Sequence, residues 1–362
     1  MVIHPALRLT LAVALAAVVQ APLPTPPEQP ASGPGGRSYP HRQIRATTLG
    51  AGAREVHVFE PAAPTPRRAP VVVFGHGWSA MTPSIYGAWI AHVVRRGYTV
   101  IFPRYQADPR TPVAQLTYHA LAATRHALES LHRPGHVVPD KRGVAFVGHS
   151  MGGLVATNLA VRAARGELPA PLALMVVAPG KTWPEPSPIA FPLDDVSQLP
   201  ARLHLLAIVG DDDDFVGEID ARKVFKGATG VAPANKNYLR VFSDDHGSPA
   251  LVADHRFASA PLPDDSPLLG PLSSTDALEQ LAQGLLRANR GTPLPPAVTA
   301  SRGTWQTDAL DYFGTWKLLD GLVDAVFRGV NREFALGDTQ EQRYMGHWSD
   351  RVQVRTLVVE NR

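Results

Sequence analysis

The sequence contains no cysteine. Disulfides, cysteine-ligated metals and thiol nucleophiles are therefore excluded, whereas the compartment is not, since an exported protein need not contain disulfides. Charged residues are also few, at 19%, and the net charge of +3 is small for 362 residues. No run of Lys and Arg is interleaved with aromatic residues, so we expect no nucleic-acid binding. The 44% of hydrophobic residues suffices for a large buried core.

Apolar runs long enough to span a membrane, which need about 20 residues, are missing as well. The apolar stretch Leu9–Val19 is shorter and follows Arg8, as the core of a signal peptide does. Val19-Gln20-Ala21 approximates a small-x-small cleavage pattern, although Pro22 is an unfavourable next residue. We therefore expect residues 1–21 to be a signal peptide. The mature chain is then secreted or located in the periplasm or cell envelope, without an integral membrane span.

Proline and glycine dominate the segment that follows. Residues 21–36 read APLPTPPEQPASGPGG, which predicts a Pro/Gly-rich linker over residues 22–42. Such a linker disfavours the alternative that the N-terminal stretch is a helix packed closely on the body. Residues 43–362 are expected to form one domain.

From residue 43 onward, short apolar strands alternate with helical segments. The strands are expected at residues 56–59, 70–74, 98–103, 143–147, 172–177, 203–209 and 238–242. The helices are expected at residues 86–96, 112–131, 154–164 and 308–327. This alternation predicts an α/β fold with a mostly parallel central sheet, right-handed crossovers and helices on both faces.

The chain after His255 has a different composition. It is rich in Pro, Gly and Ser, with a short amphipathic helix expected at Asp276–Arg290. Residues 256–303 are therefore expected to be an insertion, either a lid or a surface excursion. The tail at residues 352–359 is expected to add an edge strand.

A G-x-S-x-G pattern occurs at Gly148-His149-Ser150-Met151-Gly152. It follows an apolar strand and opens a helix, which is the strand–turn–helix that a nucleophile elbow requires. The turn is tight, so the positions two before and two after the serine must be small, and glycine fills both. The pattern predicts Ser150 as a nucleophile at the N-terminus of a helix, whose dipole favours a developing negative charge.

The segment Gly148–Gly153 (GHSMGG) resembles the nucleophile motif of α/β-hydrolase esterases and lipases. Gly75-His76-Gly77-Trp78, directly after an apolar strand, resembles the HG-type oxyanion loop of the same superfamily. The order of elements is similar over about residues 56–255. The resemblance implies the α/β-hydrolase fold and an oxyanion hole formed by the backbone N–H groups of Trp78 and Met151. It implies no cofactor and no metal, and it places four residues at the substrate: His76, Gly77, Trp78 and His149.

A serine hydroxyl needs a base to take its proton. The base is expected after the last strand of the parallel sheet, where His246 follows, and His255 is the second candidate. In the family the acid usually lies three residues after the glycine that ends the preceding strand, which selects Asp213 from Gly210–Asp214. A solvated loop is the favoured interpretation of the other aspartates, ahead of a cation site. The order Ser150, Asp213, His246 is the order of this fold.

These residues predict a serine hydrolase that cleaves carboxylic esters through a Ser-His-Asp triad and an acyl-enzyme intermediate. The expected substrate is a small-molecule or lipid-like ester. A peptidase or an acyltransferase on the same fold is the alternative, and a non-catalytic binding protein is a further one. The sequence does not indicate the oligomeric state.

Overall fold

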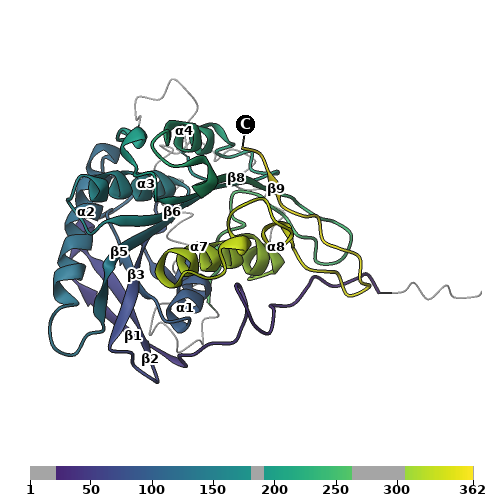
Figure 1. Cartoon of the computed structure of the whole chain (residues 1–362), viewed down its shortest axis with the longest axis horizontal. Helices are drawn as coiled ribbons and strands as arrows, with labels where there is room; N and C mark the ends of the chain where they lie inside the picture. The colour runs from purple at the N-terminus through teal and green to yellow at the C-terminus, as the bar shows by residue number, and fades with distance from the viewer. Residues whose placement is uncertain (1–21, 181–190, 263–305, 362) are drawn as a thin grey trace, which may run out of the picture.

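Apolar strands form the centre of the molecule, and helices lie on both sides of them (Figure 1). The computed structural model describes residues 22–180, 191–262 and 306–361. The expected signal peptide, the expected helix at Asp276–Arg290 and most of the expected insertion lie outside the described residues.

Within the described residues the strands form one nine-stranded sheet in the order β1-β2-β4-β3-β5-β6-β7-β8-β9. Strands β3 to β8 are mutually parallel, whereas β1, β2 and β9 pair antiparallel to their neighbours. The α/β-hydrolase fold with a mostly parallel sheet, expected from the sequence, is confirmed. The strands are β1 (Gln43–Leu49), β2 (Val56–Ala62), β3 (Arg68–Gly75), β4 (Thr99–Pro103), β5 (Val138–His149), β6 (Pro171–Val177), β7 (His204–Gly210), β8 (Lys236–Val241) and β9 (Val358–Val359).

Alternate strand residues face opposite sides of the sheet, and each side has its own core. One core packs the helices α1 and α7 against side chains such as Val72 and Phe74, and the other packs α2, α3 and α4 against Val71 and Val73. Figure 1 shows these two helix layers on either side of the sheet. The helices are α1 (Gly87–Arg95), α2 (Val113–Ser130), α3 (Met151–Ala164), α4 (Ile219–Gly227), α7 (Lys317–Arg328) and the short α8 (Gln340–Arg343).

The sheet changes its direction of winding between β3 and β5. The chain passes from β3 to β4 on one side and then returns to place β5 on the other side of β3. The register sets Gly75, at the end of β3, opposite Gly148, near the end of β5. Ligands of open parallel sheets bind at such a switch point, outside the carboxyl ends of the strands.

Differences from the sequence expectation concentrate at the edges of the fold. The strand β1 and the helix α4 were not expected, and the expected tail strand is reduced to Val358–Val359. The expected helix at residues 308–327 begins with a π-helical segment, η5 (Leu310–Trp316), before α7. The unexpected β1 alternates half-buried and exposed residues, which is a weaker signal than the continuous apolar runs of the central strands.

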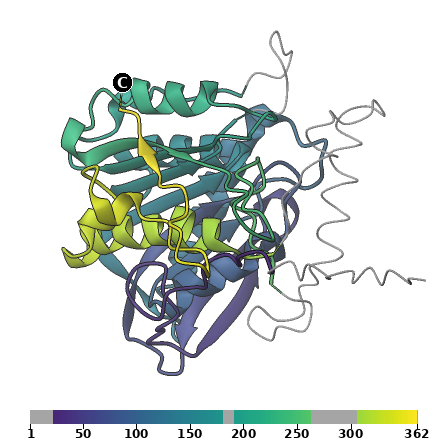
Figure 2. The same ribbon diagram turned by 90° about the vertical axis from the view of Figure 1, so that its right-hand side faces the viewer.

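The segment expected to be a Pro/Gly-rich linker packs along the domain. The Gly35 N–H donates to Oδ2 of the buried Asp320 at 2.7 Å. The same oxygen lies 2.8 Å from His92 Nε2 and forms an ion pair with Arg96 at 3.1 Å. The Pro24 carbonyl accepts from the Ser248 N–H, and Figure 2 shows this N-terminal segment beside the C-terminal one. Prolines do not prevent packing here, because a fixed extended segment needs few backbone donors.

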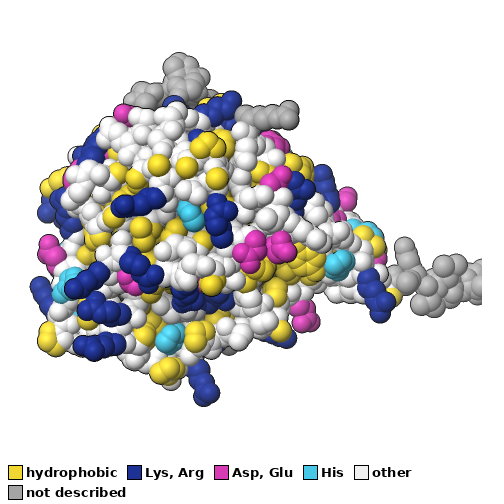
Figure 3. All heavy atoms as spheres, in the orientation of Figure 1, with side chains coloured by type: hydrophobic (Ala, Val, Ile, Leu, Met, Phe, Trp, Pro, Cys, Tyr) yellow, Lys and Arg dark blue, Asp and Glu magenta, His cyan; other side chains and the backbone are white. Residues whose placement is uncertain are grey.

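The surface carries mixed charge. On the face in Figure 3, Lys and Arg side chains are numerous where β1, β2 and β3 lie in Figure 1, and Asp and Glu side chains occur among them. Among the described residues, no helix is both long and apolar enough to cross a membrane.

Asp320 provides a test of the packed N-terminal segment. Because Asp320→Ala removes the acceptor of Gly35 N–H, the contact of His92 Nε2 and the ion-pair partner of Arg96 in a buried place, we expect the free energy of unfolding to fall by about 3 kcal/mol. Urea denaturation measures this loss. Asp108→Ala is the matched control, since that carboxylate is 46% exposed in its ion pair with Arg110, and its loss is expected to cost about 1 kcal/mol or less. Equal losses in the free energy of unfolding in the two variants would contradict the role of Asp320 in holding the N-terminal segment.

Candidate active site

Ser150 occupies the sharp turn between β5 and α3. Its backbone has φ 56° and ψ −131°, a sparsely populated conformation for a residue with a side chain. The turn is held from both sides, because the Ser150 N–H donates to the Val177 carbonyl at 3.0 Å and the Ser150 carbonyl accepts from Gly153 N–H at 2.9 Å. The strain is thus supported by the neighbouring strand and by the first turn of the helix.

The glycines around the serine are needed for backbone contact. A Cβ atom on Gly148 would lie 2.1 Å from the Gly152 carbonyl oxygen, and one on Gly152 would lie 2.2 Å from that of Gly75. A Cβ atom on Gly77 would lie 3.4 Å from Ser150 Cβ. The loop after β3 therefore lies directly against the turn that carries the serine.

His255 joins Ser150 to Asp213. Its Nε2 lies 2.9 Å from Ser150 Oγ, and its Nδ1 lies 2.9 Å from Asp213 Oδ2. Its ring packs between those of Phe215 and His149, with centroids 4.9 Å away in each case. Ser150 is 5% exposed and the His255 side chain is 15% exposed, so these side chains have little contact with water.

Asp213 follows β7 and is prepared to stay ionised. Burial raises its pKa, but the charge and hydrogen bond of His255 oppose this, together with the N–H groups of Phe215 and Val216, which donate to Oδ1. The balance lowers the pKa of Asp213 below its ordinary value. An ionised carboxylate at this place can only accept, which favours the imidazole tautomer with its proton on Nδ1 and leaves Nε2 able to accept from the Ser150 hydroxyl.

His246, the base expected from the sequence, lies elsewhere. Its Nε2 contacts Asp350 at 2.7 Å, and its side chain is 36% exposed. The expectation that His246 lies beside Ser150 is therefore wrong, and His255, the second candidate, takes that place.

The chain forms a closed loop between β8 and His255, and this loop contains His246. Asp244 and Leu251 form the antiparallel bridge that closes it. The Ala253 carbonyl then accepts from the Asp212 N–H, which brings the returning chain to the loop after β7. The sequence gives no local signal for this choice, because charged residues adjoin both histidines: Asp254 and Arg256 adjoin His255, and Asp245 precedes His246.

The two amides expected in the oxyanion hole are available. Among the described residues, neither the Trp78 N–H nor the Met151 N–H has a hydrogen-bond acceptor. The amides on either side of Trp78 are held, since Gly77 N–H donates to Tyr86 Oη at 2.9 Å and Ser79 N–H donates to Gln106 Oε1 at 2.9 Å. These two hydrogen bonds therefore fix the orientation of the Trp78 N–H and leave it free to donate.

Two residues expected to bind substrate are closed off from it. His76 is fully buried, with its ring nitrogens 2.7 Å and 2.6 Å from the carbonyl oxygens of Gly77 and Arg104, and it stacks on Tyr105. Burial lowers the pKa of His76 to about 4. Both ring nitrogens of the buried His149 are likewise used within the protein. The expectation of substrate contact is wrong for these two side chains, because neither has a free polar atom.

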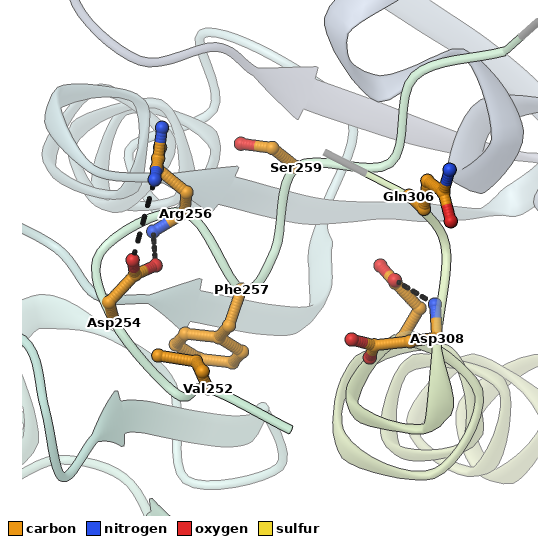
Figure 4. A pocket seen from close by; sticks show the side chains of 8 residues that line it. Val252, Asp254, Arg256, Phe257, Ser259, Gln306 and Asp308 are labelled. Carbon is orange, nitrogen blue, oxygen red and sulfur yellow. Dashed lines mark hydrogen bonds and ion pairs between the residues drawn. The ribbon is translucent and has the colours of Figure 1, made fainter. Parts of the chain in front are cut away.

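A small pocket lies on the segment that carries His255 (Figure 4). Asp254 lines it from that segment, and Asp308 lines it from the chain just before η5. Burial raises the pKa of Asp308 to about 6, and burial with the nearby Asp308 charge raises that of Asp311. The carboxyls of Asp308 and Asp311 therefore bind protons more readily than exposed carboxyls do. Within the described ranges, no group of three or more His, Asp or Glu side chains is arranged to hold a metal ion.

Comparison with known proteins agrees with this architecture. Residues 71–200 match a family described as having the alpha/beta hydrolase fold. That span runs from β3 through the turn at Ser150 and into the chain before β7, so it includes the loop after β3 and Ser150. A search of curated protein sequences gives no significant match.

Solved structures of esterases resemble the chain distantly. A thermostable esterase from Pseudomonas putida shares 19% identity over 70% of this chain and 83% of its own, with a TM-score of 0.45. Carboxyl esterase 2 from Tuber melanosporum shares 18% identity over 78% and 95%, with a TM-score of 0.45. A fungal esterase from Rhizomucor miehei shares 15% identity over 71% and 87%, also with a TM-score of 0.45. Likenesses of this size carry no information about substrate.

The two histidines give a direct test of the site. A fluorophosphonate labels only a serine whose proton is taken by a base. We expect His255→Ala to slow labelling of Ser150 by about 100-fold or more, the usual contribution of a general base. His246→Ala is the matched control and should label at the wild-type rate, measured by mass spectrometry of the intact protein. Slower labelling in His246→Ala alone would overturn the assignment of His255.

Proposed function

We propose that this chain, which has the α/β-hydrolase fold, is a serine hydrolase that cleaves carboxylic esters. The observation that carries the proposal is the position of His255, which is 2.9 Å from Ser150 Oγ on one side and from Asp213 Oδ2 on the other. A hydroxyl in this arrangement loses its proton as it attacks, so the alkoxide need never exist free.

Acylation follows from the same geometry. His255 Nε2 takes the Ser150 proton while Oγ adds to the ester carbonyl carbon. The developing oxyanion accepts from the Trp78 and Met151 amides, each of which is worth about 3 kcal/mol or more in such a site. The tetrahedral adduct then collapses, the C–O bond to the alcohol breaks, and the alcohol leaves with the proton from His255.

Deacylation repeats these steps with water. His255 takes a proton from the water molecule, the hydroxyl oxygen adds to the acyl carbon, and the Ser150 oxygen leaves with the proton returned by His255. Asp213 keeps the imidazole in one orientation throughout and stabilises the imidazolium that forms twice in each cycle.

Ester cleavage is favoured over the alternative activities by the leaving group. A peptidase and an acyltransferase would use the same triad. In a peptidase, however, the nitrogen of a peptide bond is a much poorer leaving group than the oxygen of an ester. An acyltransferase must in addition exclude water in favour of a second alcohol. The triad and the two free amides suffice for an ester. A non-catalytic binding protein would have no need of the strained Ser150 turn.

Hydrolysis of p-nitrophenyl esters, from acetate to palmitate, tests the proposal. We expect turnover by the wild type and a fall in kcat of about three orders of magnitude or more in Ser150→Ala. The chain length with the highest kcat/KM then separates a small-ester preference from a lipid-like one. A folded wild type that hydrolyses none of these esters and resists fluorophosphonate labelling would refute the proposal.

We also propose that the protein is exported, on the support of the apolar stretch Leu9–Val19 and the small-x-small pattern that ends at Ala21. N-terminal sequencing of the protein from the medium or periplasm of an expressing bacterium should find a chain that begins near Pro22. Recovery only from the cytosol, with Met1 retained, would contradict it.

A further inference from the structure

A chain of hydrogen bonds connects the oxyanion loop to the backbone of the base. The Gly77 N–H lies 2.9 Å from Tyr86 Oη, and Tyr86 Oη lies 3.0 Å from His149 Nδ1. His149 Nε2 lies 2.7 Å from the carbonyl oxygen of His255. The chain thus passes through the residue that precedes the nucleophile and ends on the residue that deprotonates it.

The chemistry of its two ends fixes the direction of every bond. The His255 carbonyl can only accept, so the proton of neutral His149 must be on Nε2. His149 Nδ1 is then bare and must accept, which makes the Tyr86 hydroxyl the donor. That hydroxyl keeps a lone pair for the Gly77 N–H, which can only donate. One tautomer and one hydroxyl orientation therefore satisfy all three contacts.

The surroundings keep the chain in this state. Tyr86 is 1% exposed and His149 is 4% exposed, so water does not compete for their polar atoms. Burial, with the nearby charge of His255 as a second cause, lowers the pKa of His149 to about 3. Burial also raises the pKa of Tyr86. A neutral imidazole and a protonated phenol persist over the working range of most enzymes.

We propose that Tyr86 and His149 are positioning residues, whose hydrogen-bonded chain from the Gly77 N–H to the His255 carbonyl sets the spacing between the oxyanion hole and the general base. The inference rests on the proposed function. Neither side chain touches the reacting atoms. Tyr86 orients the peptide next to the Trp78 donor, and His149 holds the main chain of His255, whose ring must reach both Ser150 and Asp213.

Removal of one member is expected to affect chemistry more than binding. Tyr86→Phe leaves the Gly77 N–H without an acceptor and His149 Nδ1 without a donor. Because small misplacements of a catalytic group cost up to about 100-fold in rate, we expect kcat on a p-nitrophenyl ester to fall roughly 10- to 100-fold, with KM changed little. His149→Phe should give a similar loss.

The double variant and a matched control make the measurement specific. Since both residues act through one chain, Tyr86→Phe with His149→Phe should lose little more than the worse single variant. Tyr98→Phe is the control, because Tyr98 is an equally buried tyrosine whose hydroxyl donates to Asp324, which is on α7. It should lower the unfolding midpoint without changing kcat/KM. Losses that add fully, or an equal loss of kcat in Tyr98→Phe, would overturn the proposal.

A second measurement does not depend on turnover. Proton–nitrogen correlation spectra of the wild type with 15N-labelled histidine should show a buried ring that is protonated only at Nε2 between pH 5 and 8 and whose signals are absent in His149→Phe. In Tyr86→Phe its Nδ1 resonance should shift, since that nitrogen loses its donor. The opposite tautomer, or a ring that titrates in this range, would overturn the chain even if esters are hydrolysed. If no ester is hydrolysed but the expected tautomer is seen, the proposed function fails and the hydrogen-bonded chain stands.

Discussion

The structure of the site depends on one close contact between two backbones. The end of β3 and the turn after β5 approach so nearly that a single Cβ atom on Gly152 would lie 2.2 Å from the Gly75 carbonyl oxygen. The parallel register that sets Gly75 opposite Gly148 brings the two segments into line. This contact places the loop after β3 against Ser150, and it is possible only where glycines occupy the contact positions.

Strain at Ser150 is the counterpart of that contact. A positive φ in a residue with a side chain is unfavourable by about 1 to 3 kcal/mol, and it persists because the surroundings over-determine it. The Ser150 N–H donates to the Val177 carbonyl at the end of β6, and the Ser150 carbonyl accepts from the Gly153 N–H in the first turn of α3. As a result, Oγ lies at the carboxyl edge of the sheet, within 2.9 Å of His255 Nε2, near the loops that follow β3 and β7. The fold therefore uses an unfavourable local conformation to bring Ser150 beside His255.

Buried polar groups connect the parts that the sheet alone does not fix. The loop after β3 is held by Tyr86 and Gln106, and the main chain of His255 is held through its carbonyl by His149. A similar device fastens the N-terminal segment, where Asp320 accepts from Gly35. In each case a buried polar group has its hydrogen-bond partner inside the protein. Loss of one partner leaves the other buried and unsatisfied, so each hydrogen bond strongly favours one arrangement of the two segments.

The sequence by itself determined the features that consecutive residues encode. The apolar runs gave the parallel strands, and the glycines of GHSMGG gave the strand–turn–helix at Ser150, because small residues at fixed offsets are a local requirement. Only the tertiary structure decided which histidine faces Ser150, because the loop closed by Asp244 and Leu251 carries His246 away before the chain returns. It also decided that His149 faces inward and that the N-terminal segment is packed. These contacts join residues that are far apart in the chain. They depend on the course that the loops take at the edge of the sheet, and no local sequence pattern encodes that course.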